Sequence, residues 1–457
     1  MDLMKFTMFI LAASAAAALS AQTRLAPVAV CGGETIAFVG DSITHNGYHQ
    51  MFLEYYYSTR FPETELQYLN RGTAGQSAFH LLRRMRTDIL KPKADVYVLM
   101  VGMNDVGRKY FTREERAKNP KCEEEIARLE SVYAERLAKV AEKLAENSRR
   151  LYIFSPSIFD ETLESPTDPH VGLNARLGRY GKICEDAARR IPNAEFVDIW
   201  AETVRINADF QSEAGRGKTI IGSDRVHPSE AGGFAMAAIF LKSLGEPATV
   251  CSAEIDRENI CAVNCEISNV KQSAGGLRFE SLEYALPLAL TPAEESAAKY
   301  IDFRSSLNKQ TLAVKNLPSG KYALKIDGKK VGVFHSAELA RGIDTAALET
   351  PQIEASRKIL ALCKKIRLIN ERLRFLAHLR EMFADKIKDG TTADDAANAV
   401  EEIGRTRNNP YYVRLAQLYR EHAPRENLLR EERENARAEI RAIATPRKHK
   451  YALEISE

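Results

Sequence analysis

The sequence has little of what marks several large classes of protein. Its 457 residues include 7 cysteines and 1 tryptophan. So few cysteines exclude a scaffold held together mainly by disulfides. Neither sign of charge dominates, because 65 Lys and Arg residues face 62 Asp and Glu residues and leave a net charge of +3. The chain as a whole therefore has no electrostatic reason to bind nucleic acid or an anionic membrane.

Long apolar runs are also missing after the first twenty residues. Residues 6–19 are almost entirely apolar, but they are fewer than the ~20 that span a bilayer as a helix. Basic Lys5 precedes this run, and the small residues Ala18 and Ser20 stand at its end, before the expected cleavage point. This order is typical of a secretory signal peptide, so we expect residues 1–21 to be cleaved and the protein to be secreted or periplasmic. An uncleaved membrane anchor is the alternative.

What remains is ordinary for a globular protein, with 45% hydrophobic and 28% charged residues. The length corresponds to about two to four domains. Three cysteines, Cys251, Cys261 and Cys265, lie close together in the sequence, and we expect one local disulfide among them. They lack the Cys-x-x-Cys spacing of zinc sites, which argues against a metal there.

Strand-like and helix-like segments alternate from residue 34 to 247. Apolar runs predict strands at 35–39, 65–69, 96–101, 151–154 and 195–199, and helical periodicity predicts helices at 47–59, 78–90, 121–147, 173–190 and 229–244. Because strands alternate with helices, we expect an α/β domain with a parallel sheet and helices on both faces.

The pattern changes after residue 245. Between 252 and 344, short alternating runs separated by turn residues predict a small antiparallel β module. From 345 to 450 the sequence is rich in Arg and Glu with helical periodicity, which predicts a C-terminal helical module packed on the rest of the chain. The basic residues Arg447, Lys448 and Lys450 are interpreted as a frayed, solvated terminus.

Four polar segments stand where a parallel sheet would bind a ligand. Three follow predicted strands and one precedes the last predicted helix of the α/β region, at 40–44, 70–77, 102–105 and 224–228. In an open parallel sheet, ligands bind at the carboxyl ends of the strands. Taken singly, each segment is also what an ordinary turn or helix cap contains.

The residue types in these segments fit the cleavage of an ester through a covalent intermediate. That reaction needs a hydroxyl nucleophile, a base, and a carboxylate that orients the base. Ser42 lies at a strand-to-helix turn, and His227 follows Asp224 by three residues. Gly75 lets a backbone N–H approach a substrate because it has no Cβ. Asn104 offers a side-chain N–H for the same oxygen.

Together and in this order, the four segments resemble the SGNH hydrolases, the family of GDSL lipases and esterases, over residues 34–244. The resemblance implies a flavodoxin-like three-layer α/β/α fold and no metal or cofactor. It also implies a catalytic triad and an oxyanion hole, formed by Ser42, Asp224 and His227 and by Ser42, Gly75 and Asn104 respectively.

The positions of other side chains suggest contacts with a substrate. The candidates follow either the expected nucleophile or the fourth strand, and they are His45, Asn46, Tyr48, Phe159 and Asp160. One further possibility is that the modules after about residue 245 complete the pocket from the side. Deleting them should then change substrate preference more than the reactivity of the triad.

The resemblance and the signal sequence together favour an exported serine esterase. Exported family members are often carbohydrate O-acetylesterases, so we expect short-chain acyl esters, first of all acetyl esters, on a glycan or another acylated small molecule. We expect no nucleic-acid partner and no stable membrane anchor. The alternatives are a lipase or lysophospholipase, and a non-catalytic glycan-binding or scaffold protein that retains the fold.

Overall fold

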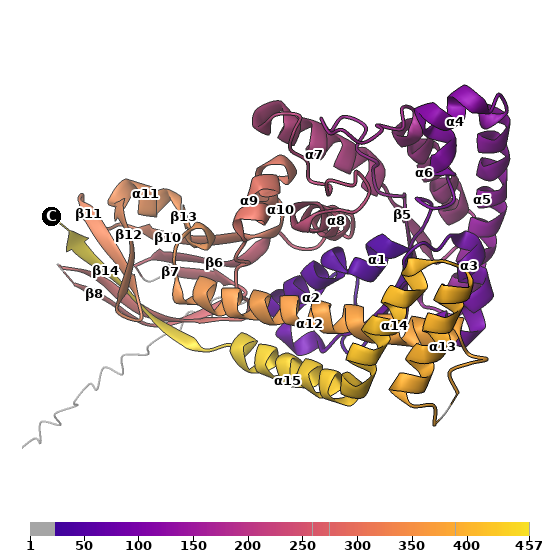
Figure 1. The fold of residues 1–457 in the computed structure, drawn as a ribbon. Coiled ribbons are helices and arrows are strands. Elements are labelled where there is room, and N and C mark those ends of the chain that lie inside the picture. Colours follow the sequence, from indigo (N-terminus) through magenta and orange to yellow (C-terminus); the bar gives the residue numbers. More distant parts are fainter. Residues whose placement is uncertain (1–22, 258, 274, 389, 457) are drawn as a thin grey trace, which may run out of the picture.

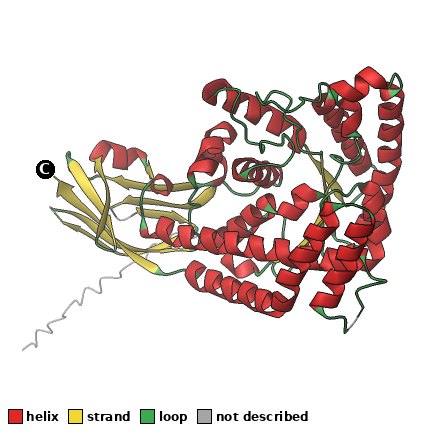
Figure 2. Ribbon diagram, viewed as in Figure 1, coloured by secondary structure: helices red, strands yellow, loops and turns green. Residues whose placement is uncertain are grey.

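The computed structural model describes residues 23–456 apart from 258, 274 and 389 (Figure 1). The predicted signal peptide, residues 1–21, lies outside the described residues. Strands gather in two places, one enclosed by helices and one at the far end of the molecule (Figure 2). The first is the sheet of the α/β domain and the second is the β module.

The α/β domain contains a parallel five-stranded sheet. Its strands are β1 (Thr35–Gly40), β2 (Gln67–Gly72), β3 (Val96–Met100), β4 (Arg150–Phe154) and β5 (Ala194–Val197), in the order β2-β1-β3-β4-β5. This order is that of flavodoxin-like folds. Successive strands are added on one side of β1 as far as β2 and on its other side from β3 onward, so the strand order reverses between β1 and β3. All five residues of β3 are buried, as an uninterrupted apolar strand in a doubly covered sheet requires.

Helices cover both faces of this sheet. They are α2 (Tyr48–Arg60), α7 (Ile199–Ala214) and α8 (Glu230–Ser243) on one face, and α3 (Ala78–Arg84), α5 (Cys122–Ala145) and α6 (Leu173–Arg189) on the other. Alternate residues of β1 supply the two cores, since Ile36 and Phe38 pack with the first set and Ala37 and Val39 with the second. The predicted three-layer α/β/α domain is confirmed.

Some local elements differ from the predictions. The fifth strand stops at Val197 because the side chain of Asp198 accepts from Ala201 N and caps α7, a helix that we did not predict. The short helix α1 (Ser42–Asn46) was also not predicted as a separate element. The predicted helix 78–90 is α3 followed by a π-helical turn, η2 (Met85–Ile89).

The β module consists of two sheets that share one core. One has the order β13-β10-β6-β7 and the other β12-β11-β14-β9-β8. Their strands are β6 (Thr249–Asp256), β7 (Asn259–Val263), β8 (Cys265–Ser273), β9 (Gly276–Glu283), β10 (Lys309–Lys315), β11 (Lys321–Ile326), β12 (Lys329–His335), β13 (Ile343–Asp344) and β14 (Lys448–Ser456). Neighbours pair antiparallel as predicted, except that β6 and β10 are parallel.

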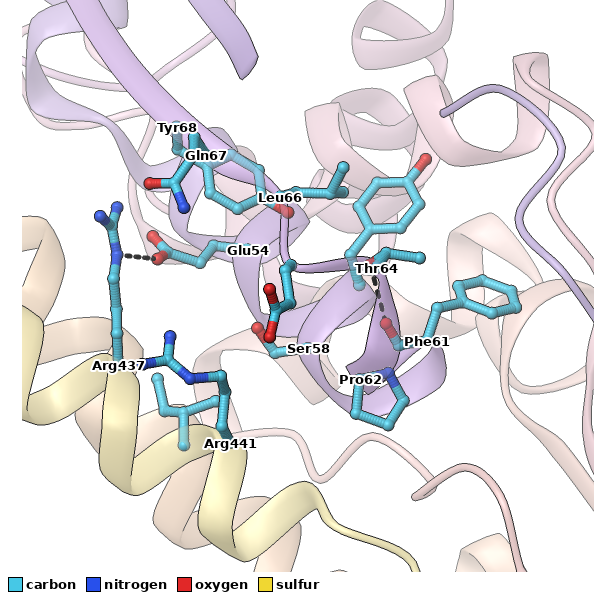
Figure 3. Close-up of a pocket in the computed structure, with 13 residues that line it drawn as sticks. Glu54, Ser58, Phe61, Pro62, Thr64, Leu66, Gln67, Tyr68, Arg437 and Arg441 are labelled. Atoms are coloured by element: carbon cyan, nitrogen blue, oxygen red, sulfur yellow. Dashed lines mark hydrogen bonds and ion pairs between the residues drawn. The ribbon is translucent and has the colours of Figure 1, made fainter. Parts of the chain in front are cut away.

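The C-terminal helices pack on the α/β domain and β module rather than standing alone. They are α12 (Pro351–Met382), α13 (Ala393–Thr406), α14 (Pro410–His422) and α15 (Glu426–Ala444). Ile359 of α12 and Ile440 of α15 belong to the same apolar core as Phe52 of α2. Arg437 of α15 also forms an ion pair with Glu54 of α2 at 3.1 Å (Figure 3).

Two expectations about the C-terminal half are wrong. Residues 448–456 are not a frayed terminus, because they form β14 between β11 and β9 in the centre of the five-stranded sheet. The buried side chains of Tyr451 and Leu453 alternate with outward-facing residues and hold the strand there. The expected local disulfide is also absent, since the described cysteines, including Cys251 and Cys265, are free thiols.

Candidate active site

Ser42 lies at the carboxyl end of β1, as the sequence predicted. A Cβ at Gly40 would come within 2.3 Å of the Met100 carbonyl oxygen, so only glycine allows this close approach to β3. Asp41 then caps the short helix α1, because its Oδ1 accepts the N–H of Ile43 at 3.0 Å. Ser42 is the first residue of that helix, where its own N–H has no partner in the helix.

The structure brings the three predicted triad residues into one chain of hydrogen bonds. His227 Nε2 lies 2.8 Å from Ser42 Oγ, although the two residues are 185 positions apart in the sequence. His227 Nδ1 lies 2.5 Å from Asp224 Oδ2. The other carboxylate oxygen, Oδ1, accepts the backbone N–H groups of Val226 and His227 at 3.0 Å each. One short turn therefore positions both the base and the carboxylate that orients it.

The charge on Asp224 sets the tautomer of His227. Partial burial acts to raise the pKa of Asp224, but the hydrogen bonds from His227 outweigh it and lower the pKa below its usual value. The ionised carboxylate accepts a hydrogen bond from the Nδ1–H group of His227. Nε2 then carries no proton, and its lone pair is directed at Ser42 Oγ. This arrangement can remove the serine proton at neutral pH.

The loops after β2 and β3 carry the two other predicted oxyanion donors. Gly75 adopts φ +75°, and no described heavy atom lies within 4 Å of the position that a Cβ would occupy. Asn104 Nδ2 donates to the carbonyl oxygen of Gln76 at 2.9 Å. An amide nitrogen has two hydrogens, so a second one is available for a substrate oxygen. Their role as an oxyanion hole stays a prediction that this geometry allows.

Two of the candidate substrate contacts are buried, and a third, His45, is partly buried. Phe159 and Asp160 are each 2% exposed. The Asp160 carboxylate accepts hydrogen bonds from the backbone and hydroxyl of Thr162, so it is part of a structured loop. His45 Nε2 lies 3.3 Å from the carbonyl oxygen of Glu371, and burial lowers the pKa of His45 to about 4. Contact of these three residues with a substrate stays a prediction, and the burial of Phe159 and Asp160 argues against it for those two.

The two remaining candidates, Asn46 and Tyr48, face α12. Arg367 Nη1 donates to the carbonyl oxygen of Asn46 at 2.9 Å. The guanidinium of the same arginine lies 4.2 Å from the centre of the Tyr48 ring. Through these contacts, Asn46 and Tyr48 pack the α/β domain against α12. Their closeness to Ser42 in the sequence does not indicate this packing.

Sequence reasoning missed Arg225, which lies between Asp224 and His227. Its side chain is buried, and Nη1 donates to the carbonyl oxygens of Asp160 and Leu163 at 2.8 Å each. Its backbone adopts φ +65°, a conformation that non-glycine residues rarely take. Arg225 thus fixes the catalytic turn to the loop that follows β4. No local sequence pattern indicates that Arg225 is buried, because an arginine in a polar turn is usually a solvent-exposed charge.

The catalytic side chains are accessible to solvent. The side chain of Asp224 is 51% exposed and that of His227 is 36% exposed. Phe79, at the start of α3 just after the Gly75 loop, is 40% exposed.

The geometry defines a serine hydrolase site on a flavodoxin-like domain, and comparison gives the family. The profile of the GDSL-like Lipase/Acylhydrolase family matches residues 38–233, a range that holds Ser42, Asp224 and His227. The α/β domain therefore belongs to this family of SGNH hydrolases.

Individual relatives extend the comparison. An acetylxylan esterase from Geobacillus stearothermophilus is 25% identical over 228 residues, which cover 47% of this chain and 94% of that protein. A structure of the acetylxylan esterase Axe2 from the same organism matches 47% of this chain and 96% of that chain, with 23% identity and a TM-score of 0.36. The structure of a gut microbial diltiazem-metabolizing enzyme covers 93% of this chain and 98% of that chain, with 24% identity and a TM-score of 0.83. The last match shows that the whole fold, including the β module and the C-terminal helices, occurs elsewhere.

Proposed function

We propose that this SGNH hydrolase is an exported serine esterase that removes short acyl groups, first of all acetyl, from carbohydrate. The observation that carries the proposal is the hydrogen-bonded chain from Asp224 through His227 to Ser42. A weakly connected serine would be a poor nucleophile, whereas this serine has its base in place before a substrate binds.

The reaction follows from these contacts. Ser42 Oγ attacks the ester carbonyl carbon while His227 Nε2 takes its proton, and the carbonyl oxygen becomes an oxyanion. The N–H groups of Ser42, Gly75 and Asn104 are the donors proposed to stabilise that charge. The carbonyl re-forms as the alcohol leaves with the proton from His227, which gives an acyl-enzyme. Water then attacks the acyl carbon, and the same histidine first takes its proton and then returns one to Ser42.

The choice of a polar, short-chain ester is supported by the shape of the site and by one relative. A half-exposed Asp224 and His227 leave room for a bulky alcohol such as a glycan on the outside of the site. Long acyl chains need a large apolar surface that shields them from water. A relative named as an acetylxylan esterase points to the same substrate class.

Export is proposed on the sequence alone, from the signal-like residues 1–21. Within the described part of the chain, none of the helices combines the length and apolar character that crossing a membrane requires. N-terminal sequencing of the protein recovered from a cell envelope fraction would test this directly. A mature N-terminus at Met1 would contradict cleavage.

The activity test compares esters that differ in acyl length and in alcohol. We expect the purified protein to hydrolyse p-nitrophenyl acetate faster than the laurate, and to release acetate from acetylated xylan. Diltiazem belongs in the panel because of the structural relative. Ser42→Ala should abolish every activity while the circular dichroism spectrum is kept. A preference for long chains would favour the lipase alternative, and a folded protein with no hydrolysis of any ester would favour a binding or scaffold role.

A further inference from the structure

Helix α12 connects the β module to the loops of the active site (Figure 1). In its first turn, the Gln352 side chain donates to Glu283 of β9 and to the Tyr451 hydroxyl of β14. One turn further, Ser356 Oγ lies 2.6 Å from the Tyr55 hydroxyl of α2. The helix then passes α1, where Glu371 meets His45. A single rigid element thus spans from one end of the molecule to the nucleophile helix.

Arg374 lies toward the C-terminal end of α12, and its side chain reaches the loop that follows β2. Its guanidinium Nε donates to the carbonyl oxygen of Gly72 at 2.7 Å. Nη2 donates to Thr73 Oγ1 at 2.7 Å and to Asp88 Oδ2 at 2.8 Å, and Nη1 donates to Asp88 Oδ1 at 2.7 Å. The side chain is 2% exposed, so all four bonds are shielded from water. Such contacts hold a loop far more firmly than exposed ones do.

The loop that Arg374 holds lies directly against the nucleophile helix. A Cβ on Gly72 would come within 2.2 Å of His45 N, which shows how closely the two backbones approach. The N–H of Thr73 donates to the carbonyl oxygen of Gly40, the residue before Asp41 and Ser42. Gly75 follows two residues later. The position of its N–H relative to Ser42 therefore depends on the segment that Arg374 fixes.

A second arginine holds the same loop from the other side. Arg84 of α3 donates through Nε to the Gln76 side chain at 2.5 Å and through Nη2 to the carbonyl oxygen of Arg71 at 2.7 Å. Its Nη1 shares the Asp88 carboxylate with Arg374. Burial acts to raise the pKa of Asp88, but the charges of Arg374 and Arg84 outweigh it and lower the pKa to about 2. Asp88 stays ionised and joins the two arginines into one cluster.

We propose that Arg374 is a positioning residue for catalysis, which the C-terminal half supplies to keep the Gly75 loop in the geometry that stabilises the oxyanion. The inference rests on the proposed esterase function. It differs from the expectation that the modules form a side wall of the pocket, because α12 reaches the buried side of the catalytic loops and not their open side. The C-terminal half then acts on the rate of the chemical step more than on the choice of substrate.

The test exchanges arginine for lysine. In Arg374→Lys, the ammonium group can still pair with Asp88, but it lacks the planar fork that binds Gly72, Thr73 and the carboxylate at once. We expect kcat for p-nitrophenyl acetate to fall about 10- to 100-fold, less than the loss of a whole oxyanion donor. KM should change by less than about twofold, because the ground-state contacts remain.

Arg380→Lys is the matched control. Arg380 lies on the same helix and pairs with Glu426 of α15 at 2.5 Å, away from the catalytic loops. Its replacement should leave kcat within about twofold of the native value. Equal kcat losses in both variants would show that α12 acts only on overall stability. Native-like kcat in a folded Arg374→Lys protein would likewise overturn the proposal.

Thr73→Val tests the route from the arginine to the loop. Valine keeps the shape of the fully buried Thr73 but cannot accept the hydrogen bond from Nη2. Its effect on kcat should be smaller than that of Arg374→Lys. In the double variant the two losses should be less than additive, as for residues that share one interaction. Strictly additive losses would contradict a shared route.

Labelling by a fluorophosphonate separates this inference from the esterase proposal. The probe phosphonylates Ser42 Oγ as the P–F bond breaks and fluoride leaves, and its phosphoryl oxygen occupies the oxyanion position, so no natural substrate is needed. If the native protein hydrolyses no ester but is labelled at Ser42, the esterase proposal fails and the ratio of labelling rates still tests Arg374. We expect Arg374→Lys to be labelled about 10-fold more slowly than Arg380→Lys. Equal rates, or no labelling of the native protein, would refute the positioning role.

Discussion

Substitution of Glu294 by glutamine should make the protein less sensitive to alkaline pH. Glu294, in the helix α9 (Pro292–Ala298), is 0% exposed. Its Oε2 accepts the N–H of Thr291 at 2.6 Å, and Oε1 has no hydrogen-bond partner among the described residues. Glu230, three residues after His227, lies beside it and pairs with Lys364 of α12. The α/β domain, α9 and α12 therefore meet at two carboxyl groups and one ammonium group.

The magnitude follows from the pKa of Glu294. Burial, with a contribution from the charge of Glu230, raises this pKa from 4.5 to about 7. The folded state therefore holds a proton that the unfolded state loses, and the resulting stability is complete below pH 4.5 and is lost as the pH rises to 7. At about 1.4 kcal/mol per pKa unit, the loss approaches ~3 kcal/mol above that range. Glutamine cannot ionise, so Glu294→Gln keeps this free energy at high pH.

Urea denaturation followed by circular dichroism measures the effect. We expect the denaturation midpoint of Glu294→Gln to match the native protein at about pH 4.5 and to exceed it clearly at about pH 8. Glu295→Gln is the control, because Glu295 is exposed and pairs only with Arg304 at 2.8 Å. A gap between Glu294→Gln and the native protein that does not widen with pH would refute the reasoning.

Two further substitutions probe the active site. Asp224→Asn places an amide donor opposite His227 Nδ1 and favours the tautomer that cannot accept the Ser42 proton, so kcat for p-nitrophenyl acetate should fall about 10³- to 10⁴-fold in a folded protein. A loss of less than tenfold would argue against the triad. Gly72→Ala brings a Cβ to 2.2 Å from His45 N, so the backbones must separate. The thermal midpoint should fall by an amount corresponding to more than about 2 kcal/mol, and an unchanged midpoint would contradict the close contact between the loop and α1.

The sequence was informative wherever the determinants are local. The apolar run of β3 and the Asp-x-x-His spacing of Asp224 and His227 each lie within a few residues, and both predictions describe the observed structure. The order of the polar segments then placed Ser42 at the same sheet edge. Parallel strands impose this arrangement whatever the rest of the chain does.

Features that depend on distant contacts escaped sequence analysis. His45 follows the nucleophile closely and is predicted to touch substrate, but its Nε2 also lies 3.3 Å from the carbonyl oxygen of Glu371, 326 positions later. Nothing near Arg374 indicates that its partners are Gly72 and Thr73. The strand β14 was missed for another reason, because its two exposed lysines, Lys448 and Lys450, suggest a solvated terminus while its buried residues occupy only alternate positions.

The place of β14 in its sheet has a consequence for the order of assembly. It follows the other described strands in the sequence, yet it pairs on both sides, with β11 and with β9. Until it emerges, both neighbours present open edges with unsatisfied backbone groups, a state prone to wrong pairing. Completion of the β module therefore waits for residues 448–456, and a truncation before residue 448 takes away the middle of a sheet rather than its margin.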